Sequence, residues 1–220
     1  MIFKALFVVA CAAPLAHGGT IAQSNHFIDD LLGTRIRSEA SAYHLDGVSV
    51  GDFTLEKIKS NSLTNRDIKG NFTNGFVRGL TGIKRAGDCS PTAWIGGNIT
   101  LSCKLDINSV FAEWKFSVKG HTLSGNIKEV PAKAQLKETT ALFEASAFPN
   151  RSVSLRTFYV EKMKFKMEVE DLGLNDERKK NLYDQLEKKA TAELYNTFYN
   201  QYSKALSNAL TRNGLVLPPV

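Results

Sequence analysis

The sequence predicts an α+β fold in which a highly curved antiparallel β-sheet wraps around a long C-terminal α-helix, with a short N-terminal helix. Three patterns predict it. A long C-terminal segment carries an apolar residue at every fourth position, the middle of the chain alternates apolar and polar residues, and a short segment near the start has one apolar face. Of the 220 residues, 43% are hydrophobic and 23% are charged. This composition excludes a mostly disordered chain.

The first 18 residues have the anatomy of a secretory signal peptide. Lys4 precedes an apolar run from Ala5 to Ala13, and Ala16-His17-Gly18 supplies small residues for a cleavage site. The run is too short for a helix that crosses about 30 Å of hydrocarbon. We therefore expect residues 1–18 to be removed and residues 19–220 to form a single domain, secreted to the extracellular space.

Secretion also predicts the state of the cysteines. Cys11 leaves with the signal peptide, so Cys89 and Cys103 remain as an even pair in an oxidising compartment. The residues between them include Gly96-Gly97, a turn signal. We expect a disulfide across a hairpin, and a ring of about 15 residues corresponds to about 3 kcal/mol of stabilisation in the chain-entropy model.

Three sites fit the acceptor pattern for N-glycosylation, in which Asn is followed two positions later by Ser or Thr. They are Asn71, Asn98 and Asn150. We expect a secreted glycoprotein modified at these positions, with Asn98 the best placed because it adjoins the Gly96-Gly97 turn.

The opening helix is expected from Ser24, as N-cap, to Ala40. Residues at helical spacing give it one apolar face, made by Phe27, Ile28, Leu31, Leu32 and Ile36.

From about Val48 to Val169 the period changes to two, as in half-buried strands. The clearest stretches run from Trp114 to Lys119 and from Lys162 to Val169. Short segments separated by turn signals indicate antiparallel strands in a meander. The turn signals are Asn74-Gly75, Gly87-Asp88, Gly96-Gly97, Lys119-Gly120 and Pro149-Asn150, and Gly79-Leu80-Thr81-Gly82 indicates a bent or bulged strand.

The last element is a helix expected from Asn175, its N-cap, to about Asn213, with Gly214 and Pro218 after its end. The apolar ridge advances by four residues per step, so it drifts by about 40° each time around the helix. A winding ridge favours a curved sheet that wraps the helix. The alternative is two helices that meet near Ala190. The ridge consists of Leu182, Leu186, Ala190, Leu194, Phe198, Tyr202, Leu206 and Leu210.

Large and adaptable side chains dominate the apolar faces that this architecture turns inward. Such an interior is either a filled core or an elongated apolar pocket, and composition alone leaves both open. The residues we expect to line a ligand, if there is a pocket, are Trp114, Phe116, Met163, Phe165, Met167, Leu186, Leu194, Phe198 and Tyr202.

Motifs for catalysis and metal binding are missing from the sequence. His26, His44 and His121 stand singly, and no GxSxG, HExxH or phosphate-binding glycine loop occurs. We therefore expect a non-enzymatic protein with no catalytic residues, no cofactor, no metal site and no nucleic-acid partner. The net charge of +6 permits an anionic membrane surface as partner.

One short basic pattern has two interpretations. Lys162, Lys164 and Lys166 would share a face of the last predicted strand. They form either a solvated face that discourages edge pairing or a patch for anionic lipid head groups.

A run of about twenty residues resembles the group 7 dust-mite allergens. Ile68-Lys69-Gly70 is followed by a Val-Arg-Gly-Leu sequence at 77–80, which leads into the Lys-Arg-x-Gly-Asp turn at 84–88. That family resembles the tubular lipid-binding (TULIP) superfamily, which includes juvenile-hormone-binding and takeout proteins and the bactericidal/permeability-increasing proteins. The resemblance implies a curved sheet around a long helix and binding of lipids or other apolar ligands.

Two functions are consistent with these patterns. The first is a secreted, non-enzymatic carrier of a lipid or other hydrophobic small molecule, bound in a groove between the sheet and the C-terminal helix. The second is a secreted effector or innate-immune pattern-binding protein, which would use its basic face to bind anionic lipid or lipopolysaccharide.

Overall fold

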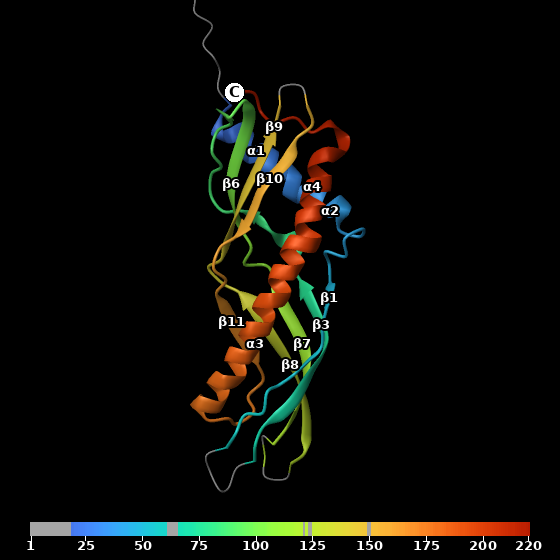
Figure 1. The fold of residues 1–220 in the computed structure, drawn as a ribbon, viewed down its shortest axis with the longest axis vertical. Coiled ribbons are helices and arrows are strands. Elements are labelled where there is room, and N and C mark those ends of the chain that lie inside the picture. The colour runs from blue at the N-terminus through green and yellow to red at the C-terminus, as the bar shows by residue number, and fades with distance from the viewer. Residues whose placement is uncertain (1–18, 61–65, 121, 123–124, 149–150) are drawn as a thin grey trace, which may run out of the picture.

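The computed structural model describes residues 19–60, 66–120, 122, 125–148 and 151–220. Its strands form two antiparallel sheets placed end to end in an elongated molecule, and the C-terminal helix runs along both of them (Figure 1). The predicted α+β architecture is therefore confirmed. The expected signal peptide (1–18) and the acceptor site at Asn150 lie outside the described residues.

The six-stranded sheet has the strand order β1-β3-β7-β8-β11, with β2 paired to β3. All of its pairs are antiparallel. Its strands are β1 (Val48–Val50), β2 (Phe53–Thr54), β3 (Lys69–Arg78), β7 (Phe111–Lys119), β8 (Ile127–Leu136) and β11 (Phe165–Val169).

The five-stranded sheet has the order β10-β9-β6-β4, with β5 paired to β6. The chain visits the two sheets in turn, crossing between them through short links such as the one from β6 to β7. The sequence predicts one continuous curved sheet, and the structure has two. The links that cross between the sheets carry no turn signal, so the sequence pattern does not show where one sheet ends and the other begins. The strands are β4 (Lys84–Arg85), β5 (Ala93–Ile95), β6 (Asn98–Asp106), β9 (Thr140–Ala147) and β10 (Ser154–Val160).

Alternation along β7 is confirmed: Trp114 and Phe116 are buried, whereas Lys115 between them is exposed. The last strand is shorter than predicted. Because β11 begins only at Phe165, Lys162, Met163 and Lys164 belong to the link that crosses from β10 in one sheet to β11 in the other.

The expected turn at Asn74-Gly75 is instead a bulge inside β3. The pairing of β3 with β7 shifts register between Thr73 and Phe76, and Asn74 has a φ of 54°. A Cβ at Gly75 would collide with the indole of Trp114. Asn and Gly satisfy a bulge for the same reason that they satisfy a turn, because both tolerate left-handed backbone conformations.

The Gly79–Gly82 segment is a turn of 3-10 helix (η2, Leu80–Gly82) after β3, where a bent or bulged strand was expected. Gly79 has a φ of 83°, and its carbonyl accepts a hydrogen bond from Ser109 Oγ at 2.9 Å. A Cβ at this position would collide with the Ser109 carbonyl oxygen.

Gly79→Ala should therefore lower the free energy of unfolding by about 2 kcal/mol, because left-handed backbone and collision both penalise a side chain. Chemical denaturation measures the change. Gly33→Ala is the matched control, since a Cβ at Gly33 meets nothing within 4 Å. This helical position should gain up to about 1 kcal/mol. Equal effects at the two glycines would contradict the strain argument.

The N-terminal helix consists of α1 (Ile21–Asp30), a π-helical turn η1 (Leu31–Arg35) and α2 (Ile36–Glu39). It begins earlier than expected. Thr20, not Ser24, is the N-cap and forms a capping box with Gln23, so Ser24 lies buried inside the helix.

The C-terminal helix consists of α3 (Asp176–Thr197), a π-helical turn η3 (Phe198–Tyr202) and α4 (Ser203–Thr211), followed by a 3-10 turn η4 (Arg212–Gly214). The predicted N-cap is confirmed, because Asn175 Oδ1 accepts the Arg178 N–H at 3.0 Å. The alternative of a break near Ala190 is wrong, since this residue lies within α3.

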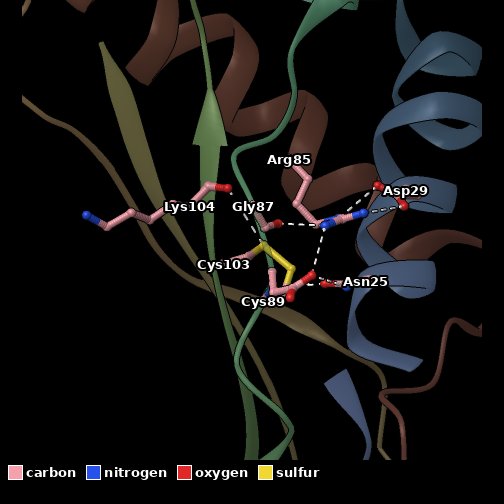
Figure 2. The surroundings of a disulfide bond; sticks show 8 residues. Asn25, Asp29, Arg85, Gly87, Cys89, Cys103 and Lys104 are labelled. Atoms are coloured by element: carbon pink, nitrogen blue, oxygen red, sulfur yellow. Dashed lines mark hydrogen bonds and ion pairs between the residues drawn. A yellow bond between two sulfur atoms is a disulfide. The ribbon is translucent and has the colours of Figure 1, made fainter. Parts of the chain in front are cut away.

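The predicted disulfide joins Cys89 and Cys103 across the β5–β6 hairpin. Figure 2 shows that it lies beside α1. Asn25 Oδ1 on α1 accepts the Cys89 N–H at 2.9 Å, and both Asp29 carboxylate oxygens accept from Arg85 at 3.1 Å. The hydrogen bond to Asp29 raises the pKa of Arg85. The disulfide loop is thus the place where the N-terminal helix is fastened to the five-stranded sheet.

Candidate functional site

The candidate site surrounds η3, the π-helical turn in the middle of the C-terminal helix. Before this turn, Cα atoms of α3 come within 8 Å of those of β3, β7, β8 and β11 in the six-stranded sheet. After it, α4 packs on β10 of the five-stranded sheet. The turn η3 therefore lies where the helix passes from one sheet to the other. Single π turns inside α-helices are frequent at functional sites.

Aromatic side chains from β10 and from the helix meet at η3. The Phe158 ring centroid lies 6.1 Å from that of Phe198 and 5.5 Å from that of Tyr202. The hydroxyl of Tyr199 accepts a hydrogen bond from the backbone N–H of Val160 at 3.2 Å, so this donor at the end of β10 has a partner. Phe198 and Tyr202 are fully buried.

Three polar atoms at this turn are buried without a hydrogen-bond partner among the described residues. They are Thr197 Oγ1, Gln201 Oε1 and Tyr202 Oη. Burial raises the pKa of Tyr202, so its phenol stays neutral and remains able to donate. A buried polar group without a partner costs about 1–3 kcal/mol. Three of them within six residues mark a place where another molecule could supply hydrogen bonds.

All nine residues expected to line a ligand lie on the inner side of the fold. Trp114, Phe116 and Met163 are buried, as are the four helix residues of the set, whereas Phe165 and Met167 on β11 are partly exposed. The structure separates them into two groups. Leu186 and Leu194 belong to α3, on the six-stranded sheet, while Phe198 and Tyr202 belong to η3 and face β10.

Small residues bring α3 close to the six-stranded sheet. Ala112, Ala132 and Ala134 are fully buried on the inner face of the sheet, and Ala190 is fully buried on the helix. Alanine leaves little side-chain volume between two backbones, which explains the Cα separations within 8 Å. In this conformation the helix itself fills the space that the strands enclose.

The edge between β11 and α3 is the least closed part of this interface. A pocket of about 60 Å³ lies there beside Val169, Leu182 and Tyr183, and an open groove of about 440 Å³ follows along Phe165, Met167 and Tyr183. The partial exposure of Phe165 and Met167 has its cause here, because β11 is the edge strand of the sheet. A ligand could reach the interior through this edge.

Sequence reasoning missed Thr197 and Gln201. Both lie beside the apolar ridge of the helix, so regular helical spacing gave them no special role. Thr197 directly precedes the π turn and is buried, whereas Gln201 lies within the turn and is partly buried, with its Oε1 atom enclosed. The one available signal was the spacing of four between two polar residues next to a continuous apolar row.

A groove of about 600 Å³ on the outer face of the six-stranded sheet was also not predicted. Phe76 and Pro131 contribute apolar surface to it. Its charged side chains pair with one another: Arg78 with Glu113 at 2.5 Å, Lys115 with Glu129 at 2.5 Å, and Lys133 with Glu168 at 3.9 Å. The groove therefore presents little uncompensated charge to a ligand.

The basic face predicted at Lys162, Lys164 and Lys166 does not form on a single strand. Lys162 and Lys164 precede β11, so the three lysines do not share one strand face. Lys164 Nζ lies 3.4 Å from Glu138 and Lys166 Nζ 2.8 Å from Glu168. Hydrogen bonds from these two ammonium groups lower the pKa of Glu138 and of Glu168, respectively. Carboxylates thus balance two of the three charges, and a role in lipid binding stays a prediction.

Of the predicted glycosylation sites, the structure describes Asn71 and Asn98. Asn71 is exposed on β3, whereas Asn98 is partly exposed and its Oδ1 is buried without a hydrogen-bond partner among the described residues. Modification at either position stays a prediction.

Among the residues that the structure describes, no three His, Cys, Asp or Glu side chains are grouped so that they could hold a metal ion.

No helix in the described part of the chain is both long enough and apolar enough to cross a membrane.

Comparison with solved structures gives the fold. The chain is similar to lipopolysaccharide binding protein, with a TM-score of 0.53 and 11% identity, over 89% of this chain and 39% of that chain. It is also similar to Takeout 1 of Epiphyas postvittana, with a TM-score of 0.41 and 14% identity, over 91% of this chain and 94% of that chain. The first similarity shows that the two proteins share a fold, and membership of the tubular lipid-binding superfamily stays a prediction. Kinship with the group 7 mite allergens stays a prediction.

Comparison with known sequences gives the family. No protein-family model matches the chain. Salivary anticoagulant protein P23 of Ixodes scapularis is 30% identical over 217 residues, which cover 96% of this chain and 97% of that protein. Because the similarity extends over nearly the whole of both chains, the protein belongs to the family of salivary anticoagulant protein P23.

Proposed function

We propose that the protein is a secreted, non-enzymatic carrier of an amphipathic lipid or similar hydrophobic small molecule, held between the sheets and the C-terminal helix by residues 19–220. The group of unpartnered polar atoms at Thr197, Gln201 and Tyr202 is the observation that carries the proposal. The hydrogen-bonding group of a ligand would satisfy atoms whose burial is otherwise unfavourable. The disulfide and the salivary relative support secretion.

The apolar part of the ligand would lie along the inner faces of the strands. Aromatic rings meet on this side of η3: the ring centroids of Phe158 and Phe198 lie 5.5 Å and 6.3 Å from that of Tyr202. Because α3 is packed closely on the sheet, uptake requires this helix to move at the edge beside β11, where Phe165 and Met167 are already partly exposed.

Tyr202→Phe tests the role of the hydroxyl. Removal of an unpartnered buried hydroxyl should raise the free energy of unfolding of the delipidated protein by about 1 kcal/mol, and it should lower ligand affinity by about tenfold. Denaturant midpoints and uptake of a fluorescent fatty acid, measured on the same samples, check both expectations.

Tyr159→Phe is the matched control. Tyr159 lies on β10 and is exposed, so the loss of its hydroxyl should alter neither quantity. If Tyr202→Phe destabilises the protein and leaves uptake unchanged, the hydroxyl has a structural partner and the proposed ligand site is wrong. Native mass spectrometry of protein from its own source tests the carrier function more generally. If no lipid co-purifies with the protein and the protein takes up no fluorescent fatty acid in vitro, the carrier function is wrong.

Anticoagulant activity is the second candidate function, and the name of the relative favours it. A secreted effector of this kind should prolong the clotting time of plasma at micromolar concentration or below. The measurement needs the reduced and alkylated protein as control, because that sample keeps the charge pattern and loses the disulfide. No prolongation at any soluble concentration would exclude this function for the chain.

A further inference from the structure

Five chain segments converge at the end of the five-stranded sheet that lies farthest from the six-stranded sheet (Figure 1). The β5–β6 hairpin turns there through Gly96 and Gly97, and β9 ends beside it, because Ala147 pairs with Ile99. The start of β10 lies beside the end of β9, because Ser154 pairs with Ser146. The C-terminal tail joins them, since Thr92 Oγ1 donates to the Pro219 carbonyl at 2.9 Å. The chain just before α1 joins them too, since a Cβ at Gly19 would collide with both of these oxygen atoms. We call this end the hairpin end.

The hairpin end has almost no charged side chains. Its segments are residues 19–25, 91–101, 145–148, 151–155 and 213–220, and Arg151 is the one Asp, Glu, Lys or Arg residue among them. In the chain as a whole, 23% of residues are charged. A protein surface in water normally carries charges of both signs, so an end without a carboxylate side chain indicates a different environment.

Large hydrophobic side chains are exposed at the same end. The exposed fractions are 54% for Trp94, 48% for Ile95 and 61% for Phe148, and Ile21 at the start of α1 is 47% exposed. The register places Ile95 opposite Asn98, and Phe148 follows the residue that pairs with Ile99. Ile95 and Phe148 therefore lie on either side of Asn98, at the tips of neighbouring strands.

We propose that the hairpin end docks on the surface of a phospholipid bilayer, with Trp94, Ile95 and Phe148 inserted into the interfacial region. Tryptophan and other large apolar side chains partition favourably at the boundary between head groups and acyl chains. Arg151 is exposed and its backbone N–H donates to the Phe148 carbonyl at 3.0 Å, so its side chain is placed to meet lipid phosphates. The proposal goes beyond the carrier function and does not depend on a ligand in the interior.

A bilayer fits this end better than a protein partner does. Stable protein interfaces bury about 800 Å² on each side and have a polar rim with hydrogen bonds. The hairpin end offers a few side chains at the tip of an elongated molecule and no carboxylate side chain for such a rim. A bilayer needs neither, because it accepts apolar side chains without specific partners.

The proposal competes with the predicted glycosylation of Asn98. A glycan there would stand between Ile95 and Phe148 and hold both away from a bilayer. Burial of Asn98 Oδ1 shows that this side chain lies against the protein. A glycan at Asn150, directly before Arg151 in the sequence, would compete in the same way. The masses of the tryptic peptides that contain Asn98 and Asn150, from protein of its own source, decide the point. A glycan on most molecules would overturn the proposal.

Tryptophan fluorescence provides a direct readout of docking. The chain has two tryptophans, and Trp114 is only 3% exposed. Changes in emission on addition of vesicles therefore report on Trp94. With vesicles of phosphatidylcholine, alone or mixed with phosphatidylserine, we expect a blue shift and protection from acrylamide. Emission that stays unchanged with both kinds of vesicle would overturn the proposal.

Substitutions locate the docking surface. Phe148→Ser and Ile95→Ser should each weaken vesicle binding about tenfold, a change that corresponds to about 1.4 kcal/mol. Ile127→Ser is the matched control, because Ile127 is 68% exposed in the other sheet. Equal losses for all three variants would overturn the proposal. A second result would also overturn the proposal: the protein does not bind vesicles but self-associates, and Phe148→Ser abolishes the self-association. The hairpin end would then be an interface between copies of the protein.

Discussion

Phe198→Ala should lower the free energy of unfolding by about 3–5 kcal/mol, the range for removal of a large aromatic side chain from a packed core. Phe198 is fully buried in η3. Its ring meets Tyr202 edge-on at 6.3 Å and lies 6.1 Å from Phe158 on β10. The substitution removes the contacts by which the middle of the helix holds the five-stranded sheet, and a loss of this size is a large part of a typical stability of 5–15 kcal/mol.

Phe148→Ala is the matched control for this prediction. It removes the same ring from a position that is 61% exposed, so its effect on stability should stay below about 0.5 kcal/mol. Denaturant unfolding of both variants measures the difference. Uptake of a fluorescent fatty acid by Phe198→Ala should rise, because the substitution opens space beside Tyr202. A loss of stability under 1 kcal/mol would mean that the ring lines a partly empty interior.

The long helix could be predicted because its signals are local. An apolar residue at each fourth position continues through α3, η3 and α4, and Asn175 supplies an N-cap that any sequence inspection can find. The N-terminal helix begins before the predicted start, because Ser24, a residue typical of N-caps, lies inside the helix and Thr20 is the N-cap. The pair Thr20 and Gln23, which forms the capping box, was present in the sequence as Thr-x-x-Gln.

The arrangement of the strands could be predicted only in part, because pairing depends on residues far apart in sequence. Alternation identified β7 and the Gly96-Gly97 turn identified the β5–β6 hairpin. Asn74-Gly75 predicts a turn and forms a bulge, since the same residues suit both. The division into two sheets depends on how β6 leads into β7 and β10 into β11, and these links carry no dipeptide that marks a change of sheet.

The apolar side of the candidate site followed from the pattern, and its polar side did not. Leu194, Phe198 and Tyr202 lie on the predicted ridge and are buried. Thr197 directly precedes the π turn and Gln201 lies within it, where the helix passes from one sheet to the other. A backbone irregularity of this kind has no sequence signature of its own, so the unpartnered atoms emerge only in three dimensions.

Removal of the disulfide should be the second large effect, with a loss of about 3 kcal/mol for Cys89→Ala combined with Cys103→Ala. In the chain-entropy model the bond stabilises by restricting a ring of about 15 residues in the unfolded chain. The folded segment keeps other contacts, because the Ser90 N–H still donates to the Ser102 carbonyl at 3.0 Å. The variant should therefore fold, and its denaturant midpoint should match that of the reduced wild-type protein.

The surroundings of the bond make this prediction more specific. The Cys89 N–H donates to Asn25 on α1, and Asn25 also donates to Asp88 at 2.8 Å, so α1 is held by the loop that the disulfide closes. Asn25→Ala should cost less in the double alanine variant than in the wild type, with a coupling of at least about 0.5 kcal/mol in a double-mutant cycle. Hydrogen exchange at α1 should increase along with it, because the loosened loop no longer holds the helix. Additive losses, with exchange at α1 unchanged, would mean that the disulfide stabilises the hairpin alone and leaves the N-terminal helix docked by its apolar face.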